Sequence, residues 1–312
     1  MIISARAGSR RLGLFSMFPL TIPQPPVIET KPRGAHLVER RMRQLCTGLD
    51  YPGTVFVKAL EAHLEAGGQR ARSRVSLTCG MQLGLAETDS VALATSVELL
   101  HNASLIQDDL QDRAQTRRGA ATVWSKYGAN CAIGLTDLAI SAAFRSIADV
   151  ADPRLILGLI DQVHRAITTT LRGQTEDLSG EIIGLDNAIA LARRKSGPLF
   201  SLALGLPLYL AGHTEALATA NRAAEDFGVG YQIYDDIVDL DDDRAANSGS
   251  NVVLALEKNL PADEARIEAH RLANQYLHSS ASAAMSLPAN SGQGLADLAA
   301  EVGQRLDLLG DE

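Results

Sequence analysis

The feature that most constrains the fold is a segment in the first half of the chain that is apolar on almost every side. Residues 91–106 read VALATSVELLHNASLI, and only Glu98, His101 and a few small polar residues interrupt the run. A helix on a protein surface carries polar residues along one whole face, which this segment lacks. We therefore expect residues 91–106 to form a helix that is surrounded by protein.

The rest of the sequence predicts further helices around it. Helical candidates cover residues 129–150, 156–171, 187–194 and 216–238. Ala and Leu carry most of the apolar content, which favours helix, and no alternating strand pattern is longer than a few residues. Gly197-Pro198 should kink or stop a helix, because proline removes a backbone donor. The predicted fold class is all-α, with residues 35–312 forming one large helical domain.

Residues 1–34 differ in kind from the rest. Arginines precede any acidic residue there, and several prolines follow, from Pro19 to Pro32. We therefore expect this segment to be a disordered arm. A short transit peptide rich in Arg and Ser is the alternative interpretation.

Composition narrows the partners and the location. A net charge of −8 argues against nucleic acid and an anionic membrane as partners. Cys46, Cys79 and Cys131 form neither a close pair nor a metal-binding spacing, which is typical of reduced thiols in an intracellular protein. The most apolar stretch, residues 198–211, is too short to span a bilayer and contains Pro207. We therefore expect a cytoplasmic protein without a transmembrane segment.

Two short aspartate clusters end two of the apolar runs. Residues 108–112 read DDLQD, and residues 235–239 read DDIVD. On a helix the first and last aspartates of each cluster project from one face. Carboxylates at that spacing suit hard divalent cations such as Mg²⁺, which take oxygens from carboxylates, water and phosphates. Either cluster alone could be a solvated helix end, but their repetition at the edge of apolar runs favours a metal site.

Basic residues accompany the clusters. Arg117 and Arg118 follow the first cluster and precede Gly119, which should end that helix or open a loop. Further cations stand beside breaks in the helical pattern: Arg70, Arg72 and Arg74 after Gly67-Gly68, and Lys195 before Gly197-Pro198. Arginine suits bidentate recognition of phosphate. A lone arginine is more often a solvated surface charge, however, and His101 taken alone is interpreted as a hydrogen-bonded core histidine.

Together these motifs resemble the trans-isoprenyl diphosphate synthases, also called polyprenyl synthetases. The motifs follow the family's order: GGQRAR at 67–72, LHNASLIQDDLQDRAQTRRG at 100–119, GQTEDL at 173–178, KSG at 195–197 and YQIYDDIVD at 231–239. The second aspartate cluster separates the chain from terpene cyclases of the same fold. The resemblance implies a homodimer of helical bundles of the isoprenoid synthase type, each with a central active-site cavity.

The resemblance also implies a reaction and residue roles. The reaction is the Mg²⁺-dependent head-to-tail condensation of isopentenyl diphosphate with an allylic diphosphate. The implied metal ligands for about three Mg²⁺ ions are Asp108, Asp112, Asp235 and Asp239, with Asp109 and Asp236 as direct or water-mediated catalytic partners. The allylic diphosphate would be held by Arg117, Lys195 and Gln232, and isopentenyl diphosphate by Arg72, His101 and Arg118, with Gln69 and Ser196 as further substrate-binding positions.

The chain departs from the family pattern at three cations. Gln69 stands where the family has a lysine, and residues 241–253, DDDRAANSGSNVV, place neither of two family lysines in register. These departures leave two alternatives to an elongating synthase. One is a prenyltransferase of the same fold that uses another acceptor, and the other is a non-catalytic partner subunit of a heteromeric synthase. The intact aspartates argue against the partner subunit.

Two small residues predict the length of the product. Ser104 and Ala103 precede Asp108 by about one helical turn, deeper in the apolar wall. A Phe or Tyr there would block a growing prenyl tail, because a packed interior does not easily give up volume. Small side chains at both positions predict a geranylgeranyl or longer trans-prenyl diphosphate.

Overall fold

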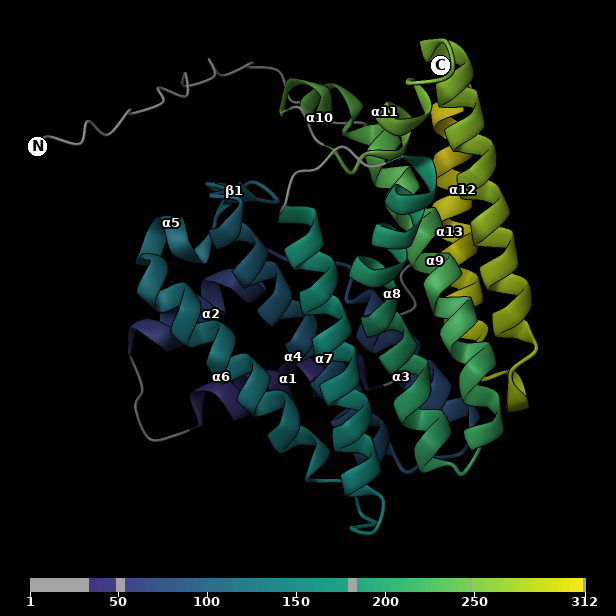
Figure 1. Ribbon diagram of the computed structural model, residues 1–312. Coiled ribbons are helices and arrows are strands. Elements are labelled where there is room, and N and C mark those ends of the chain that lie inside the picture. Colours follow the sequence, from purple (N-terminus) through teal and green to yellow (C-terminus); the bar gives the residue numbers. More distant parts are fainter. Residues whose placement is uncertain (1–33, 49–53, 179–183, 247–248, 311–312) are drawn as a thin grey trace, which may run out of the picture. The chain divides into compact units, whose positions relative to one another are not determined.

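Helices make up almost all of the structure, a computed structural model that describes residues 34–48, 54–178, 184–246 and 249–310 (Figure 1). The α-helices are α1 (Ala35–Thr47), α2 (Val55–Glu65), α3 (Ala71–Gln82), α4 (Glu87–Gln111), α5 (Val123–Tyr127), α6 (Ala129–Ile147), α7 (Ile156–Leu178), α8 (Leu185–Leu210), α9 (Leu217–Val238), α10 (Leu240–Ala246), α11 (Val252–Leu256), α12 (Ala262–Met285) and α13 (Gln293–Gly310). The short elements of the described chain are η1 (Thr214–Ala216), η2 (Pro288–Asn290), β1 (Thr116–Arg117) and β2 (Ala120–Ala121). The prediction of an all-α fold is confirmed.

All described residues belong to one unit, which runs from Pro32 to Glu312. The predicted N-terminal arm lies outside the described residues, except for Gly34, so it stays a prediction. Within the described ranges, none of the helices combines the length and the apolar character that crossing a bilayer requires.

Helix α4 lies at the centre of the packing, as its apolar sequence predicts. Helices α1, α3, α6 and α8 all pack against it. Its buried side chains include Leu93, Val97, Leu99 and Ile106. Burial of apolar surface stabilises a fold by about 25 cal/mol per Å², so a helix that is apolar all round is most stable when other helices cover it all round. The C-terminal end of α4 reaches the edge of this core, where Asp109 is still buried.

Helix α8 is longer than the sequence predicts. The expectation of a kink or stop at Gly197-Pro198 is wrong, because α8 continues through Pro198 and Pro207 to Leu210. A proline inside an exposed helix costs about 3 kcal/mol. Here both prolines are buried, in a helix that packs against α4, α7 and α9, and this packing offsets the cost. Lys195 therefore sits within a continuous helix and not at a helix end.

The segment after the first aspartate cluster forms a hairpin. The expectation that Gly119 ends that helix is wrong, because α4 already ends at Gln111. The alternative, a loop at Gly119, agrees with the turn that joins β1 to β2, which pair with Arg117 opposite Ala120. Arg118 and Gly119 form the turn, with φ angles of 54° and 77°. Two-residue turns with positive φ at both positions match the twist of paired strands. The hairpin fixes the position of Arg117 relative to the first cluster.

Helix α7 also extends beyond its predicted end, from residue 171 to Leu178. The polar sequence after residue 171 contains Gly173, which favours a helix end when only the sequence is considered. In the structure, this glycine lets α7 approach α8, because a Cβ at Gly173 would lie 3.0 Å from the backbone nitrogen of Lys195. The extension places Gln174 and Asp177 beside α8. The other predicted helices agree more closely, and α9 begins one residue after residue 216.

Helices α8 and α9 make an equally close contact. A Cβ at Gly228 would lie 2.7 Å from the backbone nitrogen of Gly197, closer than van der Waals contact allows. One turn further along α9, Gln232 lies beside Ser196, with Oε1 and Oγ 3.4 Å apart. The glycine contact therefore sets the distance between two positions that the sequence assigns to substrate binding.

Gly228→Ala should destabilise the protein, because the added methyl group would meet the backbone of α8. We expect the free energy of unfolding to fall by about 1–3 kcal/mol, the usual cost of overpacking. The matched control is Gly303→Ala on α13, where a Cβ would have Asn274 Oδ1 at 3.8 Å. This second substitution should stabilise by about 0.5–1 kcal/mol through helix propensity. Urea denaturation followed by circular dichroism measures both, and equal effects would contradict the close contact.

Candidate active site

The two aspartate clusters lie at the same end of the helical bundle. Residues 108–112 end α4, and residues 235–239 end α9. The elements that follow the clusters, β1 and α10, mark this end at the top of Figure 1. Asp112 and Asp239 are the C-caps of their helices, so each cluster follows the helical backbone up to its last residue. The carboxylates therefore emerge where the buried core ends.

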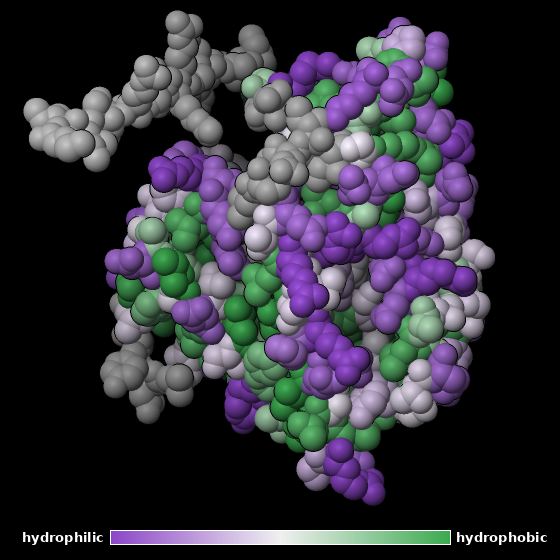
Figure 2. Space-filling view, in the orientation of Figure 1, coloured by the Kyte–Doolittle hydropathy of each residue, from purple (hydrophilic) through white to green (hydrophobic). Residues whose placement is uncertain are grey.

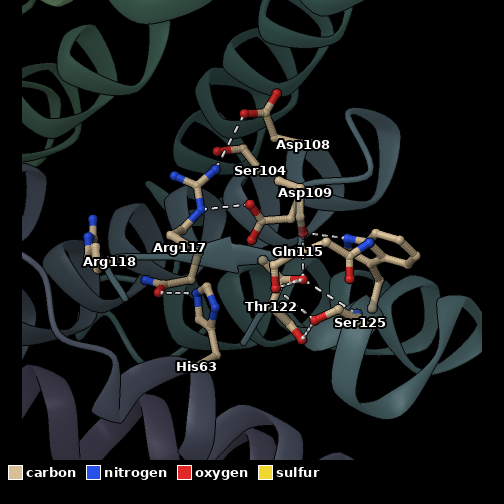
Figure 3. Close-up of polar contacts among 12 residues, drawn as sticks. His63, Ser104, Asp108, Asp109, Gln115, Arg117, Arg118, Thr122 and Ser125 are labelled. Atoms are coloured by element: carbon tan, nitrogen blue, oxygen red, sulfur yellow. Dashed lines mark hydrogen bonds and ion pairs between the residues drawn. The ribbon is translucent and has the colours of Figure 1, made fainter. Parts of the chain in front are cut away.

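At the first cluster, a buried aspartate pairs with an arginine of the hairpin (Figure 3). Asp109 is 2% exposed, and its Oδ1 accepts a hydrogen bond of 2.8 Å from Nε of Arg117. Nη2 of the same arginine lies 3.6 Å from Oδ2 of Asp108. Burial raises the pKa of Asp109, although the charge of Arg117 opposes this shift. Among the described residues, the buried Oδ2 of Asp109 has no hydrogen-bond partner, so it can accept a further donor or cation.

Polar residues of α7 and α8 face the first cluster. Nε2 of Gln174 donates to Oδ1 of Asp108 at 2.7 Å, and Nζ of Lys195 donates to Oδ2 of Asp177 at 2.6 Å. Burial alone would lower the pKa of Lys195, but the charges of Asp177 and Asp108 outweigh burial and raise it. The amine is therefore charged at neutral pH.

Two of these residues received no role from the sequence. Gln174 and Asp177 belong to the motif at residues 173–178, but they were not assigned to the site. The signal that could have found them is their spacing of i and i+3, which places both on one face of a helix. That signal was hidden because the sequence predicts α7 to end before them.

The second cluster is anchored through its most buried aspartate. Asp236 is 4% exposed, and its Oδ1 accepts a hydrogen bond of 3.0 Å from Nε2 of Gln232. Its Oδ2 accepts one of 2.8 Å from the backbone N–H of Val252, at the start of α11. Nδ2 of Asn251 donates to the backbone carbonyl of Asp236 at 2.9 Å. Asp236 thus joins α9 to α11 and holds the end of α9 in place.

Burial makes the second cluster difficult to ionise. Burial and the nearby charges of Asp239 and Asp236 raise the pKa of Asp235 to about 8. Burial also raises the pKa of Asp236 to about 7, although hydrogen bonds from Val252 and Gln232 act against it. A cation bound between such carboxylates favours their charged form. The second cluster therefore has a physical reason to bind cations.

Arg72 and His101 form a half-buried pair between α3 and α4. Nη1 of Arg72 lies 3.0 Å from Nε2 of His101, and the ring nitrogen accepts because arginine can only donate. Burial, helped by the charge of Arg72, lowers the pKa of His101 well below its usual value, so the imidazole is neutral. The guanidinium carbon of Arg72 also lies 4.3 Å from the centre of the Phe200 ring, a favourable cation–π geometry.

Arg118 reaches from the hairpin to the turn before α3. Nη1 of Arg118 donates a hydrogen bond to the backbone carbonyl of Gly67. Gly68 has a φ of +143°, and a Cβ there would collide with the guanidinium of Arg118. The backbone therefore favours glycine at this position, and a larger residue would also displace the guanidinium of Arg118. Gln69, the next residue, is exposed at the rim.

A cavity of about 160 Å³ begins at this polar rim and continues between α4, α6, α7 and α8. Its polar lining residues include Arg72, His101, Asp108, Gln174, Lys195 and Ser196. Its aliphatic lining residues include Leu100, Ile140, Ile167, Leu171 and Leu199. Ala103 and Ser104 both line it, and its described lining residues include no Phe, Tyr or Trp. The cavity can therefore take a molecule with a charged head and an apolar tail.

A larger cavity of about 530 Å³ lies between α7, α8 and α9. No residue of either aspartate cluster is among its described lining residues. Its charged side chains pair with one another, as in the ion pair of 2.5 Å between Arg165 and Asp161 and that of 3.2 Å between Arg193 and Glu225. We place the candidate active site at the smaller cavity, because Asp108 of the first cluster lines it together with Arg72 and Lys195.

The predicted site residues fall into three groups. Those that line the cavity are Arg72, His101, Ala103, Ser104, Asp108, Lys195 and Ser196. Those linked to it through polar contacts are Asp109, Arg117, Gln232 and Asp236. Those exposed at the rim are Gln69, Asp112, Arg118 and Asp239. Asp235 is half-buried on α9, and its charge acts on the pKa of Arg72.

An all-α bundle that carries two aspartate clusters at one end, the first of them beside an apolar cavity, is typical of one class of protein, the isoprenoid synthase type. The polyprenyl synthetase family model matches residues 54–253 of this chain. The chain therefore belongs to the polyprenyl synthetase family, and the resemblance stated from its motifs is confirmed.

Relatives with different products align with this chain. It is 30% identical over 213 residues to the geranylgeranyl pyrophosphate synthase of Geoglobus acetivorans, covering 66% of either chain. It is 31% identical over 228 residues to the probable farnesyl diphosphate synthase of Bradyrhizobium diazoefficiens, covering 68% of either chain. It is 27% identical over 183 residues to the octaprenyl diphosphate synthase of Haemophilus influenzae, covering 56% of this chain and 54% of the relative. The alignments thus span from about half to about two thirds of these relatives.

Solved structures show the same fold. The geranylgeranyl pyrophosphate synthetase of Geoglobus acetivorans superimposes with a TM-score of 0.77 at 22% identity, covering 86% of this chain and 98% of that one. An isoprenoid synthase family member from Thermotoga neapolitana gives a TM-score of 0.70 at 27% identity, with the same coverage of 86% and 98%. These likenesses confirm the predicted helical bundle.

Asp235→Asn should change how stability depends on pH when divalent ions are removed. The pKa of Asp235 rises from 3.8 to about 8 on folding. Its protonated form therefore stabilises the fold fully below about pH 4, and this contribution is lost as the pH rises to about 8. With a chelator present, the variant should melt at a higher temperature than the parent at about pH 8.5, and at nearly the same temperature at about pH 4.

Differential scanning calorimetry at both pH values measures this effect. Asp297→Asn, on the exposed face of α13, is the control, because Asp297 accepts only a surface hydrogen bond from Gln293. The control should shift the melting temperature equally at both pH values. A parent protein that is more stable than Asp235→Asn at the higher pH would refute the raised pKa.

Proposed function

We propose that the protein is a trans-prenyltransferase that condenses isopentenyl diphosphate head to tail with an allylic diphosphate in the presence of Mg²⁺. The observation that carries this proposal is the meeting of an aspartate, a lysine and an arginine at the mouth of an apolar cavity, namely Asp108, Lys195 and Arg72. A diphosphate needs cations, and a prenyl tail needs apolar walls. The names of the relatives support the same class of reaction.

The acidic residues fit Mg²⁺ by chemical type and by electrostatic need. Mg²⁺ prefers carboxylate oxygens, and Asp109 keeps a buried oxygen without a hydrogen-bond partner in the described structure. In the described ranges, no three acidic, His or Cys side chains converge to form a complete metal centre. Bound ions would therefore take their remaining ligands from water and from the diphosphate, as Mg²⁺ commonly does.

Within this proposal, each cluster contributes its first and last aspartate to the metal. Asp108 and Asp112 would act from α4, and Asp235 and Asp239 from α9, while about three ions per site stays a prediction. When bound, Mg²⁺ supplies electrostatic stabilisation of the negative charge on the departing diphosphate.

The cations of the chain would hold the allylic diphosphate. Lys195 is charged at neutral pH and lies near the first cluster, and Arg117 contacts the same cluster from the hairpin. Ionisation of the allylic C–O bond leaves the electron pair on the diphosphate oxygen. Fixed cations stabilise that charge because they need not reorganise during the step. Gln232 would orient the same group beside Ser196.

The remaining predicted cations would hold isopentenyl diphosphate. Arg72 and neutral His101 line the cavity, and Arg118 stands at its rim. The double bond of isopentenyl diphosphate attacks the allylic carbocation to form the new C–C bond. A proton then leaves the adjacent carbon for the departed diphosphate. Aliphatic walls exclude water, which would otherwise capture the cation.

A prenyltransferase with another acceptor is the second candidate. The observation that favours it is the missing cation at Gln69, which is neutral and exposed. Arg244, which follows the second cluster, pairs with Glu257 at 2.8 Å and so does not supply the missing charge to the site. The two candidates share ionisation and differ in the acceptor. An enzyme that cleaves the allylic diphosphate without consuming isopentenyl diphosphate would favour the second.

Asp108→Ala should abolish condensation without unfolding the protein. We expect a fall in kcat of at least about 100-fold, because electrostatic stabilisation of the departing group is lost. The assay measures product formed from labelled isopentenyl diphosphate with each allylic diphosphate and Mg²⁺. Asp297→Ala, a surface acid, should keep parental activity. A parent enzyme without product from any allylic substrate would contradict the proposed function, and loss of helical circular dichroism would contradict a catalytic role for Asp108.

The product is proposed to be geranylgeranyl or longer. The support for this length is the small size of Ala103 and Ser104, which line the cavity below Asp108. The names of the relatives cover farnesyl, geranylgeranyl and octaprenyl products, so they do not choose among lengths. The cavity walls therefore carry the argument.

Ala103→Phe should shorten the product toward fifteen carbons. The aromatic ring would occupy the space through which the growing prenyl tail passes, and the packed surroundings cannot move aside to make room for both. Ser104→Ala, which adds no volume, should leave the length unchanged. Chromatography of dephosphorylated products measures both. A parent enzyme that stops at farnesyl diphosphate would contradict the interpretation of these small residues.

Two further expectations remain proposals. A homodimer would cover exposed apolar side chains such as Ile133 of α6 and Leu157 of α7, which are 53% and 77% exposed. Figure 2 shows hydrophobic residues at the surface over these two helices. A cytoplasmic location agrees with three cysteines that are all unpaired thiols, Cys46, Cys79 and Cys131.

A further inference from the structure

A buried glutamate joins α4 to the start of α3. Glu98 is 1% exposed and precedes His101 by three residues on α4. Its Oε2 accepts a hydrogen bond of 3.1 Å from the backbone N–H of Ser73, and its Oε1 lies 3.8 Å from Nη1 of Arg70. Glu98 is not among the residues that line the cavity. No role in the reaction described above uses this carboxylate.

Glu98 acts as the cap that α3 lacks in its own sequence. The first N–H groups of a helix have no partner within the helix. The residue before α3 is Arg70, and it provides no side-chain cap. Ser73 lies in the first turn of α3, so its N–H is one of these unpartnered donors. The carboxylate of Glu98 satisfies this donor and interacts favourably with the helix dipole.

The same contact holds a backbone conformation that is unfavourable. Arg70 has a φ of 49°, in the left-handed region, which residues with side chains rarely adopt. Its guanidinium is tied down by Glu98 and by a hydrogen bond of 3.2 Å from Nη2 to the backbone carbonyl of Leu64. Because Arg72 follows two residues later, the conformation at Arg70 sets the direction in which Arg72 enters the cavity wall.

Glu98 also offsets the repulsion between neighbouring cations. Arg72 is half-buried, and burial lowers its pKa, whereas the negative charge of Glu98 acts to raise it. Glu98 acts in the same sense on the pKa of Arg118. The positive charges of Arg70, Arg72 and Arg118 repel one another, and the buried carboxylate of Glu98 reduces the cost of placing them close together.

We propose that Glu98 is a positioning residue for the second diphosphate: by capping α3 and pairing with Arg70, it holds Arg72 and His101 in the orientation that binds isopentenyl diphosphate. This inference rests on the proposed function. Glu98 is the one acidic residue within residues 91–106, and in this role it acts through Arg70 and α3 without contacting the substrate itself.

Steady-state kinetics of Glu98→Gln tests the proposal, because position and charge predict opposite results. The neutral amide is a weaker acceptor for the Ser73 N–H and cannot form an ion pair with Arg70, so the KM for isopentenyl diphosphate should rise roughly tenfold or more. The KM for the allylic diphosphate should change by less than about twofold. If Glu98 served only as an opposing charge, its removal would lower the KM for isopentenyl diphosphate. A lower KM, or equal changes in both KM values, would overturn the proposal.

Asp89→Asn is the matched control. Asp89 lies at the other end of α4, is 9% exposed, and accepts a hydrogen bond of 3.0 Å from the backbone N–H of Ala151. It should lower the melting temperature without changing the ratio of the two KM values. A changed ratio in this variant would show that any buried acid on α4 has the same effect, and would overturn a specific role for Glu98. If Glu98→Gln does not fold, Glu98→Asp takes its place: it keeps the charge but shortens the reach to Ser73, so the KM for isopentenyl diphosphate should still rise, and an unchanged KM would overturn the proposal.

Hydrogen exchange separates failure of this inference from failure of the proposed function. In Glu98→Gln, amide exchange at residues 71–74 should be roughly fivefold faster or more, because a charge-assisted hydrogen bond to the Ser73 N–H is replaced by a weaker bond to a neutral amide. In Asp89→Asn it should be unchanged there. This readout needs no substrate. Unchanged exchange in Glu98→Gln would overturn the capping role even in an active enzyme. Faster exchange in a protein that does not use isopentenyl diphosphate would support the cap and refute the proposed function.

Discussion

The structure depends on one constraint: the aspartates of the two clusters must be able to carry a charge although they lie at the edge of an aliphatic core. Helix α4 meets this constraint by running through the core and carrying the first aspartate cluster at its C-terminal end, where Asp109 is buried and the C-cap Asp112 is exposed. Burying an unpaired carboxylate is costly, so each one near the core has a partner or a raised pKa. Asp109 has a partner, Arg117. The carboxylate of Asp235 instead has a raised pKa. The arrangement of the surrounding helices follows from this need.

Two cations of the candidate site are held in place by ion pairs with aspartates of the protein. Lys195 pairs with Asp177, and Arg117 pairs with Asp109, so both are fixed in place by the protein itself. A fixed cation binds a diphosphate with little loss of side-chain entropy, because its rotamer is already selected. The close approach of α7 to α8 at Gly173 keeps Asp177 within reach of Lys195. The packing of α7 against α8 therefore also determines that Lys195 has a negatively charged partner.

The fold could be predicted from sequence because its main signal is local. An apolar run such as residues 91–106 has one stable environment, the interior of a bundle, and the aspartate patterns mark where the run ends. The continuation of α8 through Pro198 could not be predicted, because only tertiary packing offsets the cost of a proline. The same holds for Gln174, which is recognisable as a site residue only once α7 is known to reach it. Glu98 is hidden for another reason: both of its partners lie in a segment distant in sequence.

The helices around the cavity differ in how they contact one another: some touch through their backbones at glycines, and others border the cavity only with side chains. At Gly173 and Gly228 the helices α7, α8 and α9 touch through their backbones, so no substitution there is silent and these three helices form a frame of fixed spacing. On α4 and α6 the cavity is bounded by side chains, such as Ala103 and Ile140, which can be exchanged without moving a helix. Variation in what the cavity accepts should therefore accumulate on α4 and α6 during evolution, while the spacing of the other three helices is inherited unchanged.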